Sequence, residues 1–167
     1  GHDFSEAGGD CLVHLYEEQG GQFFEKLNGL FSGLLIDRRQ RKAFLFNDRY
    51  GLDRIYWHET ADAFYFASEA KALLRILPDL RAFDREGVAQ FLGVGCPLDG
   101  RTLFRDVHLL PGGSCWTFEE GCCRRETYFS PEIWEQQPEL PAAEYESRFS
   151  ELLPKILPRY FAAESKI

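Results

Sequence analysis

The 167-residue sequence contains no methionine, not even at its first position, and it opens with Gly1-His2-Asp3-Phe4. A native chain begins with methionine or with a residue that methionine removal exposes, so we expect this sequence to be part of a longer polypeptide. It also lacks a signal-peptide pattern and any apolar run near the about 18 residues of a membrane-spanning helix. We therefore expect a soluble, cytoplasmic protein that contacts no membrane.

Basic residues are in the minority. Lys and Arg total 19 against 27 Asp and Glu, which gives a net charge of −8. This balance argues against a nucleic-acid partner. The one basic cluster, residues 38–42, lies between two predicted strands, and we interpret it as a solvated hairpin turn rather than a phosphate site. The hydrophobic fraction of 44% is ample for a core.

Motifs for metals and phosphates are missing as well. The cysteines form an odd set without CxxC spacing, and the histidines are scattered, so the sequence indicates structural thiols and no metal site. The turn at Pro111-Gly112-Gly113 has neither the lysine nor the strand-loop-helix setting of a phosphate-binding loop. The cysteines are Cys11, Cys96, Cys115, Cys122 and Cys123, and the histidines are His2, His14, His58 and His108.

Four short apolar runs dominate the middle of the chain. The breaks between them are only five or six residues long, which favours antiparallel hairpins. We predict one four-stranded antiparallel meander over residues 28–67. Its first two strands are almost continuously apolar, so Phe31, Leu35, Phe44 and Phe46 should be buried, with both faces of these strands covered. The runs are residues 30–36, 43–46, 54–57 and 63–67.

Capping residues predict the helices around this sheet. Asp10 begins a helix through Gln19 as its N-cap, and a short helix at residues 22–27 buries Phe23, Phe24 and Leu27. Ser68 caps a helix that ends at Pro78. Asp84 caps another, in which Val88, Phe91 and Leu92 should pack inward. Residues 107–110, 114–118 and 122–129 are predicted strands.

The end of the chain has a different composition. Residues 130–140 carry Pro131 and Pro138 among polar residues, which indicates a linker. Residues 141–167 form an amphipathic helical segment that Pro154 and Pro158 should kink or stop. We therefore divide the chain into a domain at residues 1–129, this linker and the helical segment.

The reversal at residues 47–51 has two interpretations. Asp48 and Arg49 could contact a ligand, or they could form an ion pair that braces a tight turn. The second is favoured, because such residues recur wherever strands reverse.

Four collinear pieces carry a resemblance: HLYEEQG, LNGLFSGLLID, FNDRYGLDRIYW and FASEAKALL. In this order and spacing they resemble the second half of the glutaminase domain of glutamine-dependent asparagine synthetases, and GRTLFRDVHLLPGG extends the similarity weakly. The resemblance covers roughly residues 8–129. It implies an α+β fold, part of an αββα sandwich with an N-terminal nucleophile, and the two-sided burial predicted above agrees with it.

The resemblance also implies where the catalytic and glutamine-binding residues would lie. A glutaminase of this class uses an N-terminal cysteine with its own α-amino group as base, whereas this sequence starts with Gly1, so we assign no catalytic residue to it. One glutamine-binding aspartate would precede the HLYEE helix. Asp10 is the nearest match, but an ungapped count places Gly8 in that position, and Asp10 then serves only as the helix N-cap.

Two functions stay open. In the first, the chain is an inactive fragment of an enzyme that hydrolyses glutamine and transfers ammonia to ATP-activated aspartate or a similar carboxylate. The resemblance implies ATP and Mg²⁺ in a synthetase domain that residues 141–167 would lead into; its SGGxDS loop does not occur here, and we assign this fragment no cofactor. In the second, the chain is a non-catalytic interaction module. Asn47 and Asp53-Arg54 depart from the family pattern, which weakens asparagine as the product.

The expected partners follow from the same comparison. They are glutamine, the rest of the polypeptide and a second copy of the chain. A half-domain leaves apolar surface and strand edges uncovered, so we expect a two-fold homodimer.

Overall fold

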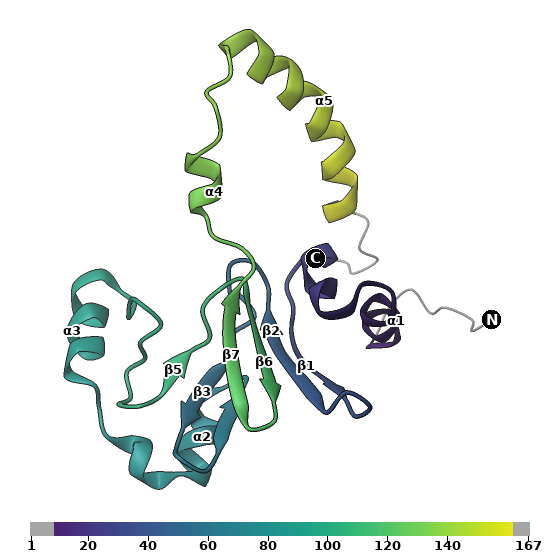
Figure 1. Ribbon diagram of the computed structural model, residues 1–167. Coiled ribbons are helices and arrows are strands. Elements are labelled where there is room, and N and C mark those ends of the chain that lie inside the picture. The colour runs from purple at the N-terminus through teal and green to yellow at the C-terminus, as the bar shows by residue number, and fades with distance from the viewer. Residues whose placement is uncertain (1–8, 162–167) are drawn as a thin grey trace. The chain divides into compact units, whose positions relative to one another are not determined.

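The computed structural model describes the backbone of residues 9–161 and the side chains of residues 12–158 and 161. It divides into two compact units, Gly1–Ser130 and Pro131–Ile167. The first unit contains two antiparallel sheets and the helices that cover them, and the second contains two helices (Figure 1).

The strands of the first unit form two separate sheets. Sheet A has the order β1-β2-β6-β7, and sheet B has the order β4-β3-β5. Every pair is antiparallel. Sheet A consists of β1 (Ser32–Asp37), β2 (Lys42–Asn47), β6 (Ser114–Glu119) and β7 (Cys122–Thr127); sheet B consists of β3 (Tyr56–Glu59), β4 (Phe64–Ala67) and β5 (His108–Leu109).

The predicted single meander is therefore wrong, although all four of its strands exist. β2 pairs with β6, about 70 residues further along the chain, and β3 pairs with β4 and β5 in the other sheet. Hairpin spacing indicates which strands can be neighbours, but a pairing between distant segments leaves no local signal. The break at residues 48–53 carries the chain from one sheet to the other instead of turning it back.

The prediction of two-sided burial is confirmed for β2 and wrong for β1. Phe44, Leu45 and Phe46 are buried on alternating faces of β2. β1 is an edge strand, with Leu34 43% exposed and Ile36 61% exposed. Phe31 and Leu35 are only half-buried. An edge strand lacks a neighbour on one side, so its residues lose cover even when its sequence is apolar.

Helices α1 (Gly9–Gln19) and η1 (Gly20–Lys26) cover the outer face of sheet A. The predicted short helix at residues 22–27 is the 3₁₀ helix η1, which buries Phe23 and Phe24 against Phe44 and Phe46. These rings meet edge to face, with Phe23 and Phe46 centroids 5.1 Å apart.

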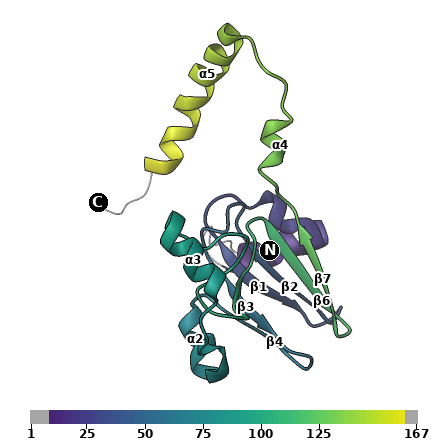
Figure 2. The same ribbon diagram turned by 90° about the vertical axis from the view of Figure 1, so that its left-hand side faces the viewer.

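Two further clusters complete the layering. Between the sheets lie Leu45, Ile55, Leu110 and Trp116. On the far side of sheet B, α2 (Ala70–Ile76) and η2 (Pro78–Arg81) pack through Leu73 and Leu80 (Figure 2). The order of layers is helix, sheet, sheet, helix, which confirms the predicted α+β class.

The helix caps are partly as predicted. Asp84 caps α3 (Arg85–Val94) and accepts a hydrogen bond from the Glu86 N–H at 3.2 Å. For α2 the N-cap is Glu69, with no side-chain bond, so the prediction of Ser68 is wrong.

The prediction that Phe91 and Leu92 face inward is also wrong. Both are exposed, Phe91 by 47% and Leu92 by 79%. α3 touches the domain through Gly87, where a Cβ would lie 2.1 Å from the Thr102 carbonyl oxygen. This close backbone approach holds the first half of the helix and leaves the second half uncovered.

The second unit contains α4 (Glu132–Glu135), inside the predicted linker, and α5 (Ala142–Phe161). Pro154 and Pro158 lie within α5, and the helix continues past both, so of the two predicted outcomes, a kink or a stop, the stop does not occur. Proline removes single hydrogen bonds, and the bonds of its neighbours keep the turn together here. The predicted apolar stripe, which includes Tyr145, Phe149 and Ile156, is exposed.

We predict that Phe44→Ala lowers the unfolding free energy by about 3–5 kcal/mol, because it removes buried apolar contacts and leaves a cavity. Phe91→Ala is the matched control and should cost less than about 1 kcal/mol, since that ring is largely solvated. Urea denaturation of both variants measures the difference. Similar losses in the two variants would contradict the proposed position of the core.

Candidate functional site

The predicted glutamine-binding residue lies in the first turn of α1. The helix begins at Gly9, one residue before the predicted start, so the backbone of Asp10 belongs to the helix and is not its N-cap. Gly8 and the side chain of Asp10 lie outside the described part of the chain. The choice between the two positions stays a prediction.

A groove of about 830 Å³ runs between α1, η1 and the outer face of sheet A. Its charged lining includes Glu17, Asp37, Glu119, Arg38, Arg39, Lys42 and Arg124. Several of these groups form ion pairs or hydrogen bonds with neighbouring side chains. Lys42 Nζ lies 3.2 Å from Glu119 Oε1, and the Tyr16 hydroxyl donates to Asp37 Oδ2 at 2.8 Å.

Tyr16 and Asp37 brace the end of β1. Burial, then the hydrogen bond and charge of Asp37, raise the pKa of Tyr16 to about 12. Backbone and side-chain hydrogen bonds, that from the Gln40 N–H foremost, lower the pKa of Asp37. Asp37 Oδ1 accepts from the N–H groups of Arg39 and Gln40 at 2.8 and 2.9 Å. The basic cluster at residues 38–42 is thus a hairpin turn, as predicted.

The turn after β2 is a buried polar feature. Asp48 is only 1% exposed, and its carboxylate points into the turn. It accepts hydrogen bonds from the backbone N–H groups of Tyr50 (3.0 Å), Leu52 (3.2 Å) and Asp53 (2.9 Å). The turn interpretation therefore holds, but the brace is made of backbone amides, and the predicted ion pair with Arg49 is not what holds it. The Arg49 guanidinium instead lies 5.8 Å from the centre of the Phe129 ring.

Asn47 connects this turn to the last strands of the domain. Its side chain is fully buried, donates to the Leu110 carbonyl oxygen at 3.3 Å and accepts from the Ser114 N–H at 3.0 Å. The backbone carbonyl oxygen of Asn47 accepts a hydrogen bond from the Tyr128 hydroxyl at 2.7 Å. The position at which the sequence departs from the family pattern therefore joins β2 to residues 110–128.

The turn at residues 111–113 packs against the Asn47–Asp48 turn. The Gly113 N–H donates to the Asp48 carbonyl oxygen at 2.8 Å. A Cβ on Gly112 would lie 2.6 Å from the carbonyl carbon of Tyr50, so only glycine fits. The structure thus confirms a turn at Pro111-Gly112-Gly113 and gives it a partner, the Asn47–Asp48 turn.

The described cysteines offer no activated thiol in the core. Cys115 is buried, and this burial raises its pKa to about 12, so the thiol stays protonated at neutral pH. Cys96, Cys122 and Cys123 are free thiols, the first two exposed. In residues 12–158, no three His, Cys, Asp or Glu side chains come together in a way that could hold a metal ion.

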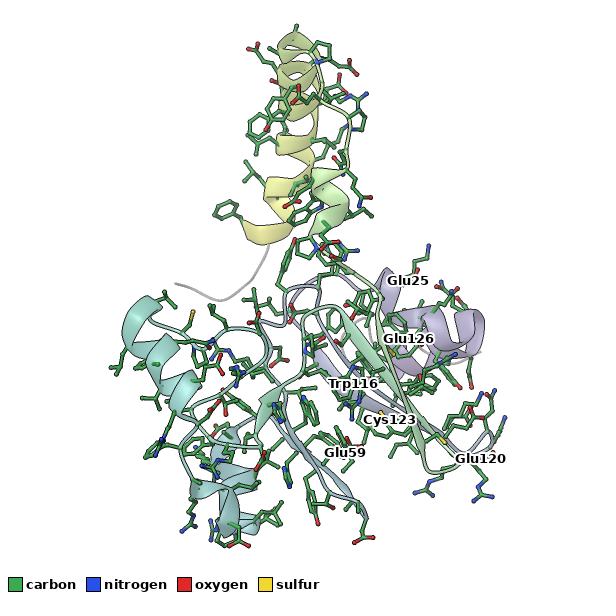
Figure 3. All side chains as sticks on the ribbon, turned by 60° about the vertical axis from the view of Figure 1, so that its left-hand side comes forward. Glu25, Glu59, Trp116, Glu120, Cys123 and Glu126 are labelled. Carbon is green, nitrogen blue, oxygen red and sulfur yellow. The ribbon has the colours of Figure 1, made fainter. Side chains whose placement is uncertain are left out.

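A further cluster at one end of the sandwich was missed in the sequence. The Arg125 guanidinium lies over the rings of Trp116 and Trp57, 4.6 and 4.9 Å from their centres, and pairs with Glu59. Figure 3 labels Trp116, from sheet A, and Glu59, from sheet B. No sequence spacing could reveal this cluster, because its members lie on three strands of two sheets. It ties the sheets together by cation–π contacts and an ion pair.

His108 lies beside this cluster, 4.7 Å from the Trp57 ring centre. Burial, followed by repulsion from His58, Arg101 and Arg125, lowers the pKa of His108, and Asp106 only partly opposes this. The unfolded chain therefore binds a proton at higher pH than the folded chain does.

We predict that unfolding free energy falls as the pH drops below the ordinary histidine value of about 6.5, and that His108→Gln reduces this fall. The variant cannot take up the proton that stabilises the unfolded state. Urea denaturation at pH 8 and pH 5 of both proteins gives the comparison, with His14→Gln as a control. An equal pH dependence with and without His108 would refute the prediction.

We predict that Asp48→Ala lowers the unfolding free energy by roughly 2–4 kcal/mol, because three turn amides lose a charged acceptor. Asp53→Ala, five residues away and exposed, should cost less than about 1 kcal/mol. Thermal unfolding followed by circular dichroism distinguishes the two. A silent Asp48 variant would show that the turn does not depend on its carboxylate.

The architecture defines the class: a four-layer α+β sandwich of two antiparallel sheets between helices. The family model described as "Glutamine amidotransferase domain" matches residues 1–129. The chain therefore belongs to the glutamine amidotransferase domain family.

Curated relatives are glutamine-hydrolysing asparagine synthetases. Asparagine synthetase 2 of Bacillus subtilis is 41% identical over 66 residues, which are 38% of this chain and 9% of the relative. Asparagine synthetase 3 of the same organism is 28% identical over 123 residues, 72% of this chain and 20% of the relative. The Zea mays enzyme is 39% identical over 75 residues, 43% and 13% of the two chains. The chain spans a fifth or less of the length of these relatives.

None of the helices in residues 9–161 is long and apolar enough to cross a membrane.

Proposed function

We propose that this chain forms part of the glutaminase domain of an asparagine synthetase-like ligase. In this proposal the intact protein hydrolyses glutamine to glutamate and ammonia. The ammonia then attacks a carboxylate, of aspartate or a similar acid, that ATP has activated. The observation that carries the proposal is the family match over residues 1–129, together with relatives that are named glutamine-hydrolysing asparagine synthetases.

The residues described here provide the scaffold rather than the nucleophile. The buried turn at Asn47 and Asp48 joins β2 to the segment that follows it and to residues 110–114, and in this proposal Asp10 or Gly8 occupies the position that binds the α-amino group of glutamine. A carboxylate suits that role because it pairs with an ammonium group. Burial of Cys115 leaves it unsuited to nucleophilic attack.

The remaining partners belong to the same proposal. ATP and Mg²⁺ bind to a different part of the intact polypeptide, and no residue of this chain is assigned to them. The protein works in the cytoplasm and associates as a two-fold homodimer.

We predict that a polypeptide of these 167 residues releases no ammonia from glutamine. It starts with Gly1, and an interior cysteine cannot provide the free α-amino group that serves as base in this class of glutaminase. A coupled ammonia assay at pH 8 measures the release. Ammonia above the buffer blank that rises with protein concentration would contradict the prediction.

The protein encoded by the complete gene is the matched comparison. The proposal expects it to form glutamate from glutamine, and to form an amide product when ATP and aspartate are added. A complete protein that hydrolyses no glutamine would instead support a non-catalytic interaction module built on the same sandwich.

A further inference from the structure

The chain leaves the first unit through a segment that is held by close backbone contacts. The match to the glutamine amidotransferase domain ends at residue 129, and the first unit ends at Ser130. Just before this exit, the Tyr128 N–H donates to the Gly113 carbonyl oxygen at 2.7 Å. A Cβ on Gly113 would lie 2.7 Å from the Phe129 carbonyl oxygen, so no side chain fits between the two backbones.

Tyr128 joins the exit to the interior of the domain. Its hydroxyl donates to the Asn47 carbonyl oxygen at 2.7 Å, and its ring centre lies 4.8 Å from that of Phe24 in η1. Burial, followed by the charge of Asp48, raises the pKa of Tyr128 to about 12, so the hydroxyl keeps its proton at neutral pH and remains a donor. Tyr128 therefore contacts both the helical layer and the turn after β2.

Phe129 is held by the outer side of the same turn. Its ring meets that of Tyr50 edge to face, with centres 5.8 Å apart, and the Arg49 guanidinium lies over it at 5.8 Å. Arg49 and Tyr50 flank the position where the Asp48 carboxylate binds the turn amides. The three apolar clusters of the described residues form without Phe129 and Tyr50. Their contact therefore fixes the exit of the chain more than it adds to the core.

The transfer of ammonia gives the position of this exit a chemical consequence. In the proposed ligase, water cleaves the side-chain amide of glutamine to glutamate and ammonia. The ammonia nitrogen then forms a bond to the carboxyl carbon that ATP has activated, as the activating group leaves. Ammonia that escapes into water at neutral pH takes up a proton and loses the electron pair that attacks. A fixed geometry between the two reactions therefore favours transfer over escape.

We propose that Phe129 is a positioning residue for ammonia transfer. Together with Tyr128 it fastens the exit of the glutaminase domain to the Asn47–Asp48 turn, and so positions the part of the intact polypeptide that activates the carboxylate. This inference rests on the proposed function. Phe129 itself touches neither glutamine nor ammonia. When its contacts are lost, the domain still hydrolyses glutamine, but more ammonia escapes before it reaches the activated carboxylate.

The ratio of amide product to glutamate, measured with glutamine, ATP and aspartate in the protein encoded by the complete gene, tests the proposal. Phe129→Ala should lower this ratio roughly two- to tenfold, while kcat and KM for glutamate formation stay at their wild-type values. Phe129→Tyr keeps a ring against Tyr50 and should retain the wild-type ratio. Phe83→Ala is the matched control, because that ring is also exposed and stacks on one neighbour, Phe104, at 5.7 Å. Its ratio should not change.

Ammonium chloride in place of glutamine separates positioning from a structural role. With it, Phe129→Ala should form amide at the wild-type rate, because activation of the carboxylate is intact. An unchanged ratio in Phe129→Ala, or equal losses of glutamate and amide formation, would overturn the positioning role and leave the proposed function standing. A wild-type protein that forms no glutamate, or no amide, would overturn the proposed function and this inference with it.

Discussion

The buried turn formed by Asn47 and Asp48 is the constraint on which the rest of the first unit depends. The carboxylate of Asp48 gathers three amides of the following turn, and the amide of Asn47 bonds to residues 110 and 114, more than 60 positions later. Unpaired, each of these buried groups would cost about 1–3 kcal/mol. The network therefore fixes where the chain leaves sheet A for sheet B, and where it returns.

β2, the strand that leads into that turn, contributes side chains to two clusters of the core. Its odd- and even-numbered side chains serve different layers: Phe44 and Phe46 pack under α1 and η1, and Leu45 packs between the sheets. β1 and β7, one on each side of the β2–β6 pair, are the sheet's edges. The Arg125 cluster then closes one end of the sandwich by joining strands of both sheets. β2 thus packs into both apolar clusters of sheet A, and the turn that follows it leads the chain into sheet B.

This arrangement separates scaffold from chemistry in the family to which the chain belongs. The most buried polar residues are Asn47, Asp48 and Ser114. The side chains of Asn47 and Asp48 bond to backbone groups, and the backbone N–H of Ser114 is one of the donors. The thiol of Cys115 is kept protonated by its apolar surroundings. The described residues of the first unit therefore form a structural frame within the glutamine amidotransferase domain.

Local chemistry in the sequence determined the strands, the turns at residues 47–51 and 111–113, the Asp84 cap and the α+β class, because each depends on neighbours in the chain. Tertiary structure decided the pairing of β2 with β6, the exposure of β1 and of Phe91 and Leu92, and the Arg125 cluster, because each depends on segments far apart in sequence. The candidate site divides in the same way. The family resemblance marked Asp10 and residue types marked the Asn47–Asp48 turn, but only the fold showed that backbone amides, rather than an ion pair with Arg49, hold the Asp48 carboxylate, since burial is a property of the assembled layers.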